Sequence, residues 1–201
     1  MNFGTMEKKL LYVHGFASSG SSGTVMALRR HLVGWKVVAP DLPVDPFEAM
    51  ELLRKTIDKE QPKLVIGTSM GGMYTQQLWG MPRIVVNPSF EMSRTLLFNH
   101  MGKHKYTAKR KDGATEFRID KQIVEQFKLM EQTQFDGIDD FEKLFVYGLF
   151  GDKDPVVHFQ PLMAELYGEE RCVWFDGEHR LNDTIVKRDL IPLINKLLQE
   201  V

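Results

Sequence analysis

The feature of this sequence that most limits its fold is an alternation of short apolar runs with longer helix-like stretches. Short runs rich in β-branched or aromatic residues and bounded by Gly, Pro, Asn or Asp predict strands. They lie at residues 10–13, 35–39, 64–66, 83–86, 144–150 and 171–175. The helix-like stretches lie at residues 24–33, 46–59, 70–78, 155–167 and 182–198, and Pro192 should kink or split the last of them. Because strands that alternate with helices form βαβ units, we expect an α/β fold with a mostly parallel sheet of about six strands and helices on both faces.

One long segment interrupts this alternation. From about Phe90 to Phe141 no run predicts a strand, and the segment is polar, with a basic stretch between Lys103 and Lys111. A structureless loop of this length is uncommon in a compact domain. We therefore expect a partly helical, lid-like insertion at about residues 90–141, lying over one end of the sheet. The length of 201 residues fits a single domain, residues 1–201, that carries this insertion.

A serine lies in a glycine-rich turn directly after the third predicted strand. Residues 67–71 read Gly-Thr-Ser-Met-Gly, and a helix-like stretch follows them. Between a strand and a helix, Gly-x-Ser-x-Gly holds the serine on a tight, strained turn that exposes its Oγ, and small neighbours let strand and helix approach. We interpret Ser69 as a nucleophile; the alternative is a glycine-rich turn with an N-capping serine.

The first predicted strand ends in His14-Gly15-Phe16. In a fold of this kind, a backbone N–H from the loop after that strand and one from the residue after the nucleophile bind the oxyanion of a tetrahedral intermediate. We predict that Phe16 and Met70 supply these two N–H groups. His14 is expected to brace its own loop rather than to act as a base.

A serine nucleophile needs an adjacent base, and the base needs an orienting carboxylate. The fifth predicted strand runs into Asp152-Lys-Asp154-Pro, and the sixth runs into a glycine-containing loop with His179. The order Ser, Asp, His along the chain is the one expected for this architecture. His179 is the predicted base, since the other histidines lie in helix-like stretches, in the insertion or beside the acid. Asp154 is preferred to Asp152 as the acid, although Asp154 before a proline is also typical of a helix N-cap.

Composition excludes several other classes of protein. Lys and Arg total 26 and Asp and Glu total 27, so no strong net charge favours nucleic acid or an anionic membrane. The only cysteine, Cys172, lies in an apolar run and is expected to be an inert thiol. No apolar run approaches the length of a membrane span, and residues 1–9 lack the pattern of a signal peptide, so we expect a cytoplasmic protein. No residues have the spacing of metal ligands, and no metal or other cofactor is expected.

The residues described so far resemble the α/β-hydrolase superfamily and, more narrowly, small bacterial esterases of the YqiA type. The resemblance covers nearly the whole chain and depends on residues 11–19, 40–43, 67–72, 85–88, 151–157 and 177–179. It implies a three-layer α/β-hydrolase fold with Ser69 as nucleophile and His179 as base. The family's acid is followed, after one residue, by an apolar pair, which fits Asp154 and not Asp152. The family also implies short acyl or aryl esters as assay substrates, but its pattern does not extend to residues 90–141, where we expect substrate choice to lie.

The sequence therefore predicts a serine hydrolase that cleaves a small-molecule carboxylic ester or thioester through a Ser-His-Asp triad and an acyl-enzyme. Three alternatives remain. The same triad could transfer an acyl group to another acceptor or hydrolyse a carbon–carbon bond. The fold could be a non-catalytic binding scaffold, and the basic stretch from Lys103 to Lys111 could contact nucleic acid. The sequence leaves the acyl chain length and the oligomeric state open.

Overall fold

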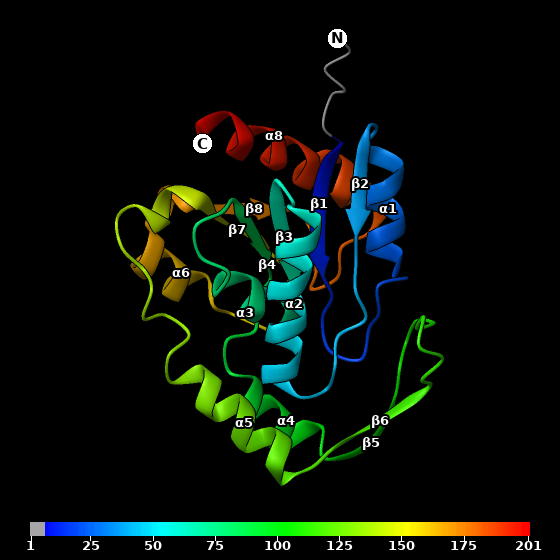
Figure 1. The fold of residues 1–201 in the computed structure, drawn as a ribbon. Helices are drawn as coiled ribbons and strands as arrows, with labels where there is room; N and C mark the ends of the chain where they lie inside the picture. The colour runs from blue at the N-terminus through cyan, green and yellow to red at the C-terminus, as the bar shows by residue number, and fades with distance from the viewer. Residues whose placement is uncertain (1–6) are drawn as a thin grey trace.

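The protein is built on a six-stranded, all-parallel sheet with the strand order β2-β1-β3-β4-β7-β8 (Figure 1). The computed structural model describes residues 7–201. The prediction that residues 1–9 are not a signal peptide therefore falls mostly on residues 1–6, which lie outside the described residues. The strands are β1 Lys8–Val13, β2 Trp35–Val38, β3 Leu64–Thr68, β4 Arg83–Val86, β7 Val146–Gly151 and β8 Cys172–Phe175. This confirms the predicted parallel sheet and the identity of its strands.

Helices cover both faces of the sheet, as the alternating pattern predicts. One face packs against α2 Pro46–Glu60, α3 Met70–Gln76 and α6 Gln160–Tyr167. The other packs against α1 Gly23–His31 and the C-terminal elements α7 Asp183–Ile185, η3 Val186–Leu190 and α8 Ile191–Glu200. Short 3₁₀ turns, η1 Glu142–Phe145 and η2 Glu169–Arg171, lead into the last two strands. None of the helices in the described part of the chain is long and apolar enough to span a membrane.

Proline positions explain one helix prediction that needs correction and one that holds. The helix expected from residue 155 begins only at Gln160, because Pro161 is tolerated in the first turn of a helix and not further inside it. The C-terminal stretch is divided near Pro192, as predicted: the π-helical turn η3 separates α7 from α8, and Pro192 falls in the first turn of α8.

The insertion lies beyond the carboxyl ends of the strands, at the bottom of Figure 1. It consists of α4 Met92–Asn99, the antiparallel pair β5 Gly102–Lys105 and β6 Glu116–Ile119, and α5 Lys121–Glu131. The expectation that this segment has no strand was wrong. Each strand has four residues, and charged side chains alternate with inward ones, so the pair lacks the apolar run that predicts a buried strand.

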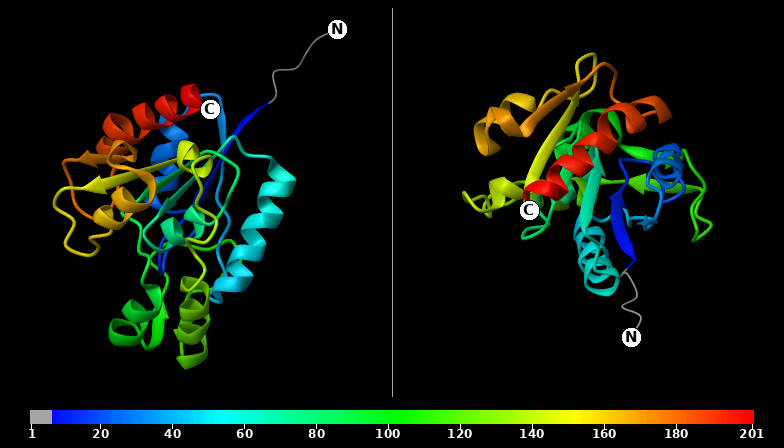
Figure 2. Two further views of the ribbon diagram at one scale, coloured as in Figure 1. Left: turned by 90° about the vertical axis from the view of Figure 1, so that its left-hand side faces the viewer. Right: turned by 90° about the horizontal axis from the view of Figure 1, so that it is seen from above.

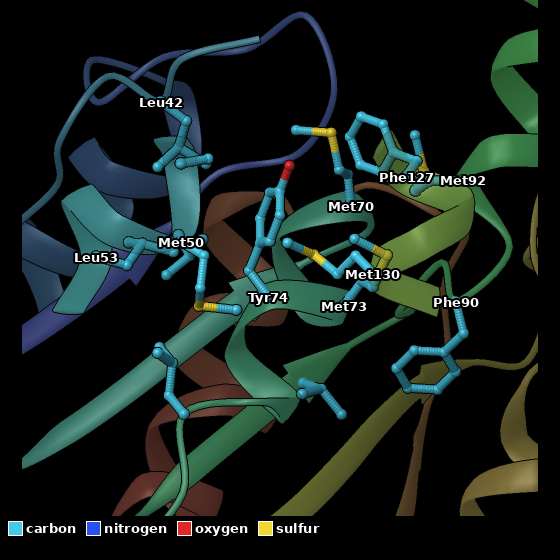
Figure 3. Packing of buried hydrophobic residues seen from close by; sticks show 14 of the residues in the cluster. Leu42, Met50, Leu53, Met70, Met73, Tyr74, Phe90, Met92, Phe127 and Met130 are labelled. Carbon is cyan, nitrogen blue, oxygen red and sulfur yellow. The ribbon is translucent and has the colours of Figure 1, made fainter. Parts of the chain in front are cut away.

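The insertion shares a core with the sheet. In Figure 3, Tyr74 of α3 lies between Met50 of α2 and the insertion residues Phe127 and Met130, and all four side chains are buried. The Tyr74 and Phe127 rings lie 6.3 Å apart. Helix α5 is therefore packed onto the domain by apolar burial, the main favourable contribution to folding. Figure 2 shows α4 and α5 projecting together from the strand ends.

Candidate active site

The candidate site lies where the strand order reverses. From β1 the chain crosses to β2 on one side, and β3 then pairs with β1 on the other side. The loops that follow β1 and β3 therefore part from each other at the carboxyl edge of the sheet. In open parallel sheets, such a switch point forms the crevice in which ligands bind.

Ser69 lies in this crevice in a strained backbone conformation. Its φ of 55° and ψ of −122° are unusual for a residue with a side chain. The strain is held by neighbouring backbone: the Ser69 N–H donates to the Val86 carbonyl at 3.0 Å, and its carbonyl accepts from Gly72 at 2.8 Å and Ser89 at 3.1 Å. The sequence prediction of a tight, strained turn at this serine is confirmed.

The glycines around Ser69 are required by close approach. A Cβ on Gly67 would lie 2.2 Å from the carbonyl oxygen of Gly71, and one on Gly71 would lie 2.2 Å from that of Val13. Such contacts essentially do not occur between real atoms. Strand β3, helix α3 and the end of β1 can therefore meet only because these positions lack side chains.

A chain of hydrogen bonds connects Ser69 to the loops after β7 and β8. His179 Nε2 lies 3.0 Å from Ser69 Oγ, and His179 Nδ1 lies 2.7 Å from Asp154 Oδ2. The Asp154 side chain is 4% exposed and that of His179 is 18% exposed, so the line is largely shielded from water. This is the geometry that removal of the serine proton by an oriented imidazole requires.

Both carboxylate oxygens of Asp154 have hydrogen-bond partners. Its Oδ1 accepts from the N–H groups of Val156 at 2.7 Å and Val157 at 3.2 Å, while Oδ2 faces His179. The alternative role of Asp154 as a helix N-cap was wrong, because α6 begins only at Gln160 with Phe159 as its N-cap; the two bonds instead hold the bend that follows Asp154. Asp152 is exposed, and its Oδ1 accepts instead from the Gly177 N–H at 3.0 Å. The structure brings Asp154, and not Asp152, to His179.

The loop after β1 lies against the nucleophile. A Cβ on Gly15 would lie 3.2 Å from Ser69 Cβ and 3.8 Å from Ser69 Oγ. Among residues 7–201, the N–H groups of Phe16 and Met70 donate no hydrogen bond. Two backbone donors thus remain available next to Ser69, at the positions expected from the sequence.

His14 braces its loop, as predicted. Its Nε2 accepts from the Leu42 N–H at 3.1 Å, which leaves Nδ1–H to donate to the Gly15 carbonyl at 2.9 Å. Burial is the main reason that the pKa of His14 lies below its usual range, so the ring is kept neutral. Both ring nitrogens are occupied, and His14 is not placed to act as a base.

Three other histidines and the cysteine make contacts that do not involve Ser69, His179 or Asp154. His31 is paired with Asp183 at 3.0 Å, and the rings of His100 and His104 pack on Phe16 at centroid distances of 4.7 and 5.5 Å. Burial raises the pKa of Cys172 to about 11, which fits the expected inert thiol. Within the described residues, no group of three or more His, Cys, Asp and Glu is arranged to hold a metal ion.

Asn87 is a residue that sequence reasoning did not single out. It is 1% exposed and has a φ of 41°, a conformation that asparagine tolerates better than most residues. Its Oδ1 accepts from the Gly151 N–H at 2.8 Å, and its Nδ2 donates to the carbonyls of Glu178 at 3.2 Å and His179 at 3.0 Å. One amide therefore connects the end of β7 to the loop that carries His179. The available signal was the Val-Asn-Pro stretch at the end of β4.

The fold and the site geometry define this protein as a member of the α/β-hydrolase class. Residues 9–195 match the family described as Uncharacterised protein family (UPF0227), and the chain belongs to that family. The matched range includes the insertion. This confirms the predicted resemblance at the level of superfamily and family. No curated protein matches the chain.

Solved structures of esterases and lipases share the fold. A monoacylglycerol lipase from Paleococcus ferrophilus is 14% identical, with a TM-score of 0.65 over 96% of this chain and 95% of that one. Est1E from Butyrivibrio proteoclasticus is 15% identical, with a TM-score of 0.66 over 97% and 90%. A thioesterase domain from the curacin biosynthetic pathway is 13% identical, with a TM-score of 0.59 over 96% and 92%. At these identities the likeness establishes the fold.

Proposed function

We propose that this protein is a serine hydrolase that cleaves a carboxylic ester or thioester through an acyl-enzyme. The observation that carries the proposal is the continuous line from Ser69 Oγ through His179 to Asp154, with distances of 3.0 and 2.7 Å. Similarity of fold to esterases, a lipase and a thioesterase domain supports it without specifying a substrate.

In the first half-reaction His179 Nε2 takes the proton of Ser69 as Oγ attacks the substrate carbonyl carbon. The carbonyl electron pair moves onto oxygen, where the Phe16 and Met70 N–H groups stabilise the charge. Asp154 keeps the proton of the imidazole on Nδ1, so that Nε2 can accept. When the tetrahedral intermediate collapses, the bond to the leaving group breaks and His179 gives its proton to the departing oxygen or sulfur.

In the second half-reaction a water molecule takes the place of the leaving group. His179 removes a proton from water, and the resulting hydroxide attacks the acyl carbon of the Ser69 ester. Collapse of the second tetrahedral intermediate releases the carboxylic acid and returns the proton to Ser69 Oγ. Each proton removed by His179 is delivered within the same half-reaction, and no external oxidant or reductant is required.

The test compares two serine variants in hydrolysis of 4-nitrophenyl acetate. Ser69→Ala should reduce kcat by at least about 10⁴-fold, because loss of the nucleophile leaves only the surrounding electrostatic and binding contributions. Ser21→Ala is the matched control, since Ser21 is an exposed serine of the loop after β1, and it should hydrolyse the ester as the wild type does. Equal hydrolysis by Ser69→Ala and wild type would refute the proposal.

A further inference from the structure

Two cavities lie close to Ser69, one lined by Met70, which follows it in the chain, and one by Ser89, which contacts its backbone. One is an apolar pocket of about 20 Å³ whose lining includes Phe16 and Met70, and its far wall is formed by Tyr106, Phe117 and Ile119 of the insertion. The other is an open groove of about 460 Å³ between α4 and residues 156–159, lined by polar and apolar side chains, including Arg94, Phe98 and His158. The groove also touches Ser89, whose N–H donates to the Ser69 carbonyl at 3.1 Å.

The proposed reaction decides which part of the substrate lies in which cavity. The leaving-group oxygen or sulfur must receive a proton from His179, so it lies on that side of the carbonyl carbon. The groove runs along residues 156–159, the continuation of the segment whose N–H groups hold Asp154. The leaving group therefore extends into the groove. The acyl chain then occupies the apolar pocket beside Phe16 and Met70.

The far wall of the pocket is held in place by polar contacts at the tip of the β5–β6 hairpin. Thr107 donates to the Ala17 carbonyl through its N–H at 2.7 Å and through Oγ1 at 3.0 Å. The Arg110 side chain is 5% exposed; its Nη1 donates to the Leu42 carbonyl at 3.1 Å, and its guanidinium lies 4.4 Å from the centre of the Tyr106 ring. The wall is thus fixed to the loop after β1 and to the segment after β2.

Further contacts join the hairpin tip to the same two segments. Ser19 Oγ donates to the Lys109 carbonyl at 2.9 Å. Asp41 accepts from the Gly20 N–H at 2.7 Å and, with its other oxygen, from the Lys111 N–H at 2.6 Å. Most of these bonds involve backbone atoms, so they hold the tip whatever side chains are exposed on it. The basic stretch that could have indicated nucleic-acid binding therefore has a structural role at several of its positions.

Phe117 is the wall residue best placed to limit pocket depth. It is half-buried, and its ring lies 5.3 Å from that of Phe16 and 4.6 Å from that of Tyr106. A cavity needs about 10–15 Å³ to hold one water-sized group. A pocket of about 20 Å³ thus has room for about one methyl-sized group and little more.

On the basis of the proposed function, we propose that the β5–β6 hairpin closes the acyl pocket and that Phe117 and Tyr106 set the upper limit of acyl chain length. The substrate class is an ester or thioester of a small acyl group, of about two or three carbons, with a larger alcohol or thiol that occupies the groove beside α4. The insertion then selects the acyl group through a fixed wall.

The test measures kcat/KM for 4-nitrophenyl esters of acetic, propanoic, butanoic and hexanoic acid. The wild type should favour acetyl or propanoyl over hexanoyl by at least about tenfold. Each methylene group of the acyl chain that becomes buried in the enlarged pocket should raise kcat/KM about fourfold. Phe117→Ala should therefore raise the hexanoyl-to-acetyl ratio by roughly 10- to 60-fold, and Tyr106→Ala, made in case the first variant does not fold, should raise it in the same direction.

Two further variants serve as controls. Phe141→Ala removes a ring that is 61% exposed and lines neither cavity, and its acyl-chain profile should match the wild type. Phe98→Ala removes a ring from the groove. It should raise KM for 1-naphthyl acetate and leave the hexanoyl-to-acetyl ratio unchanged.

The outcomes separate this inference from the proposed function. If hydrolysis depends on Ser69 but the wild type treats hexanoyl and acetyl esters alike, the acyl-pocket assignment is overturned and the proposed function stands. The same holds if Phe98→Ala, and neither Phe117→Ala nor Tyr106→Ala, changes the acyl-chain profile, since the two cavities would then have exchanged roles. If no ester is hydrolysed in a Ser69-dependent way, the proposed function itself fails, and this inference with it.

Discussion

Replacing Asp154 by asparagine should trap His179 in the wrong tautomer. Asp154 Oδ1 accepts from Val156 and Val157, so an asparagine at this position must keep its oxygen towards these two donors. Its NH₂ group then takes the place of Oδ2, 2.7 Å from His179 Nδ1. Because the NH₂ group can only donate, Nδ1 must accept, and the imidazole proton moves to Nε2.

With its proton on Nε2, His179 cannot take the proton of Ser69, although the two atoms lie 3.0 Å apart. If the side-chain amide of Asn at position 154 rotated by 180°, its NH₂ group would face the N–H groups of Val156 and Val157. Each donor left without an acceptor would cost about 1–3 kcal/mol. The tautomer is therefore locked. We expect Asp154→Asn to lower kcat for a short acyl ester on the order of 10⁴-fold with little change in KM.

The matched control is Asp152→Asn, two positions earlier in the same loop, whose carboxylate hydrogen-bonds to Gly177 and not to His179. Its single side-chain hydrogen bond, from the Gly177 N–H at 3.0 Å, can be made equally well by an amide oxygen. Its kcat should stay within about threefold of wild type, as is usual for an exposed substitution. The reasoning is refuted if Asp152→Asn loses activity to a similar extent, or if Asp154→Asn keeps more than about a tenth of wild-type kcat.

Three other substitutions test positioning and stability. Asn87→Ala removes the amide that donates to the carbonyl of His179. It should lower kcat by roughly 10- to 100-fold at nearly unchanged KM, since small displacements of catalytic groups have effects of that size. A loss of stability alone, with normal kcat, would contradict this positioning role. Burial lowers the pKa of His14 from 6.5, so the unfolded chain binds a proton that the native state excludes. Stability should be full above about pH 6.5 and fall as the pH drops towards the native pKa, and His14→Asn should flatten this dependence in urea unfolding; an unchanged slope would count against it. Glu142→Ala leaves the fully buried Arg83 without the carboxylate that lies 2.5 Å from its guanidinium. The free energy of unfolding should fall by about 3–5 kcal/mol, because a buried charge loses its partner. A decrease below about 1 kcal/mol would show that the pair is not buried in solution.

The sheet could be predicted from the sequence because each of its strands is an apolar run between turn residues. Runs such as Leu64–Thr68 and Arg83–Val86 are buried on both faces and carry the strongest signal that a parallel sheet gives. The site residues could be placed for a related reason. They follow the carboxyl ends of parallel strands, and those ends meet at one edge of the sheet whatever the details of the loops.

The insertion could not be predicted to the same extent, because its structure depends on long-range contacts. The segment around Arg110 reads as a solvated basic run, yet that side chain is buried against Leu42 and Tyr106. Its partners lie up to 68 positions away along the chain, and no local pattern indicates them. The role of Asn87 was missed for the same reason, since its three hydrogen bonds join loops that are 64 to 92 positions distant.

The most direct test of the central claim is reaction with a fluorophosphonate, followed by mass spectrometry of the digested protein. A fluorophosphonate modifies a serine only where an adjacent base activates it, and the 3.0 Å contact between His179 Nε2 and Ser69 Oγ predicts such activation. We expect stoichiometric modification of the peptide that contains Ser69, strong reduction in Asp154→Asn and none in Ser69→Ala. Modification of another serine, or an unmodified wild-type protein, would contradict the account.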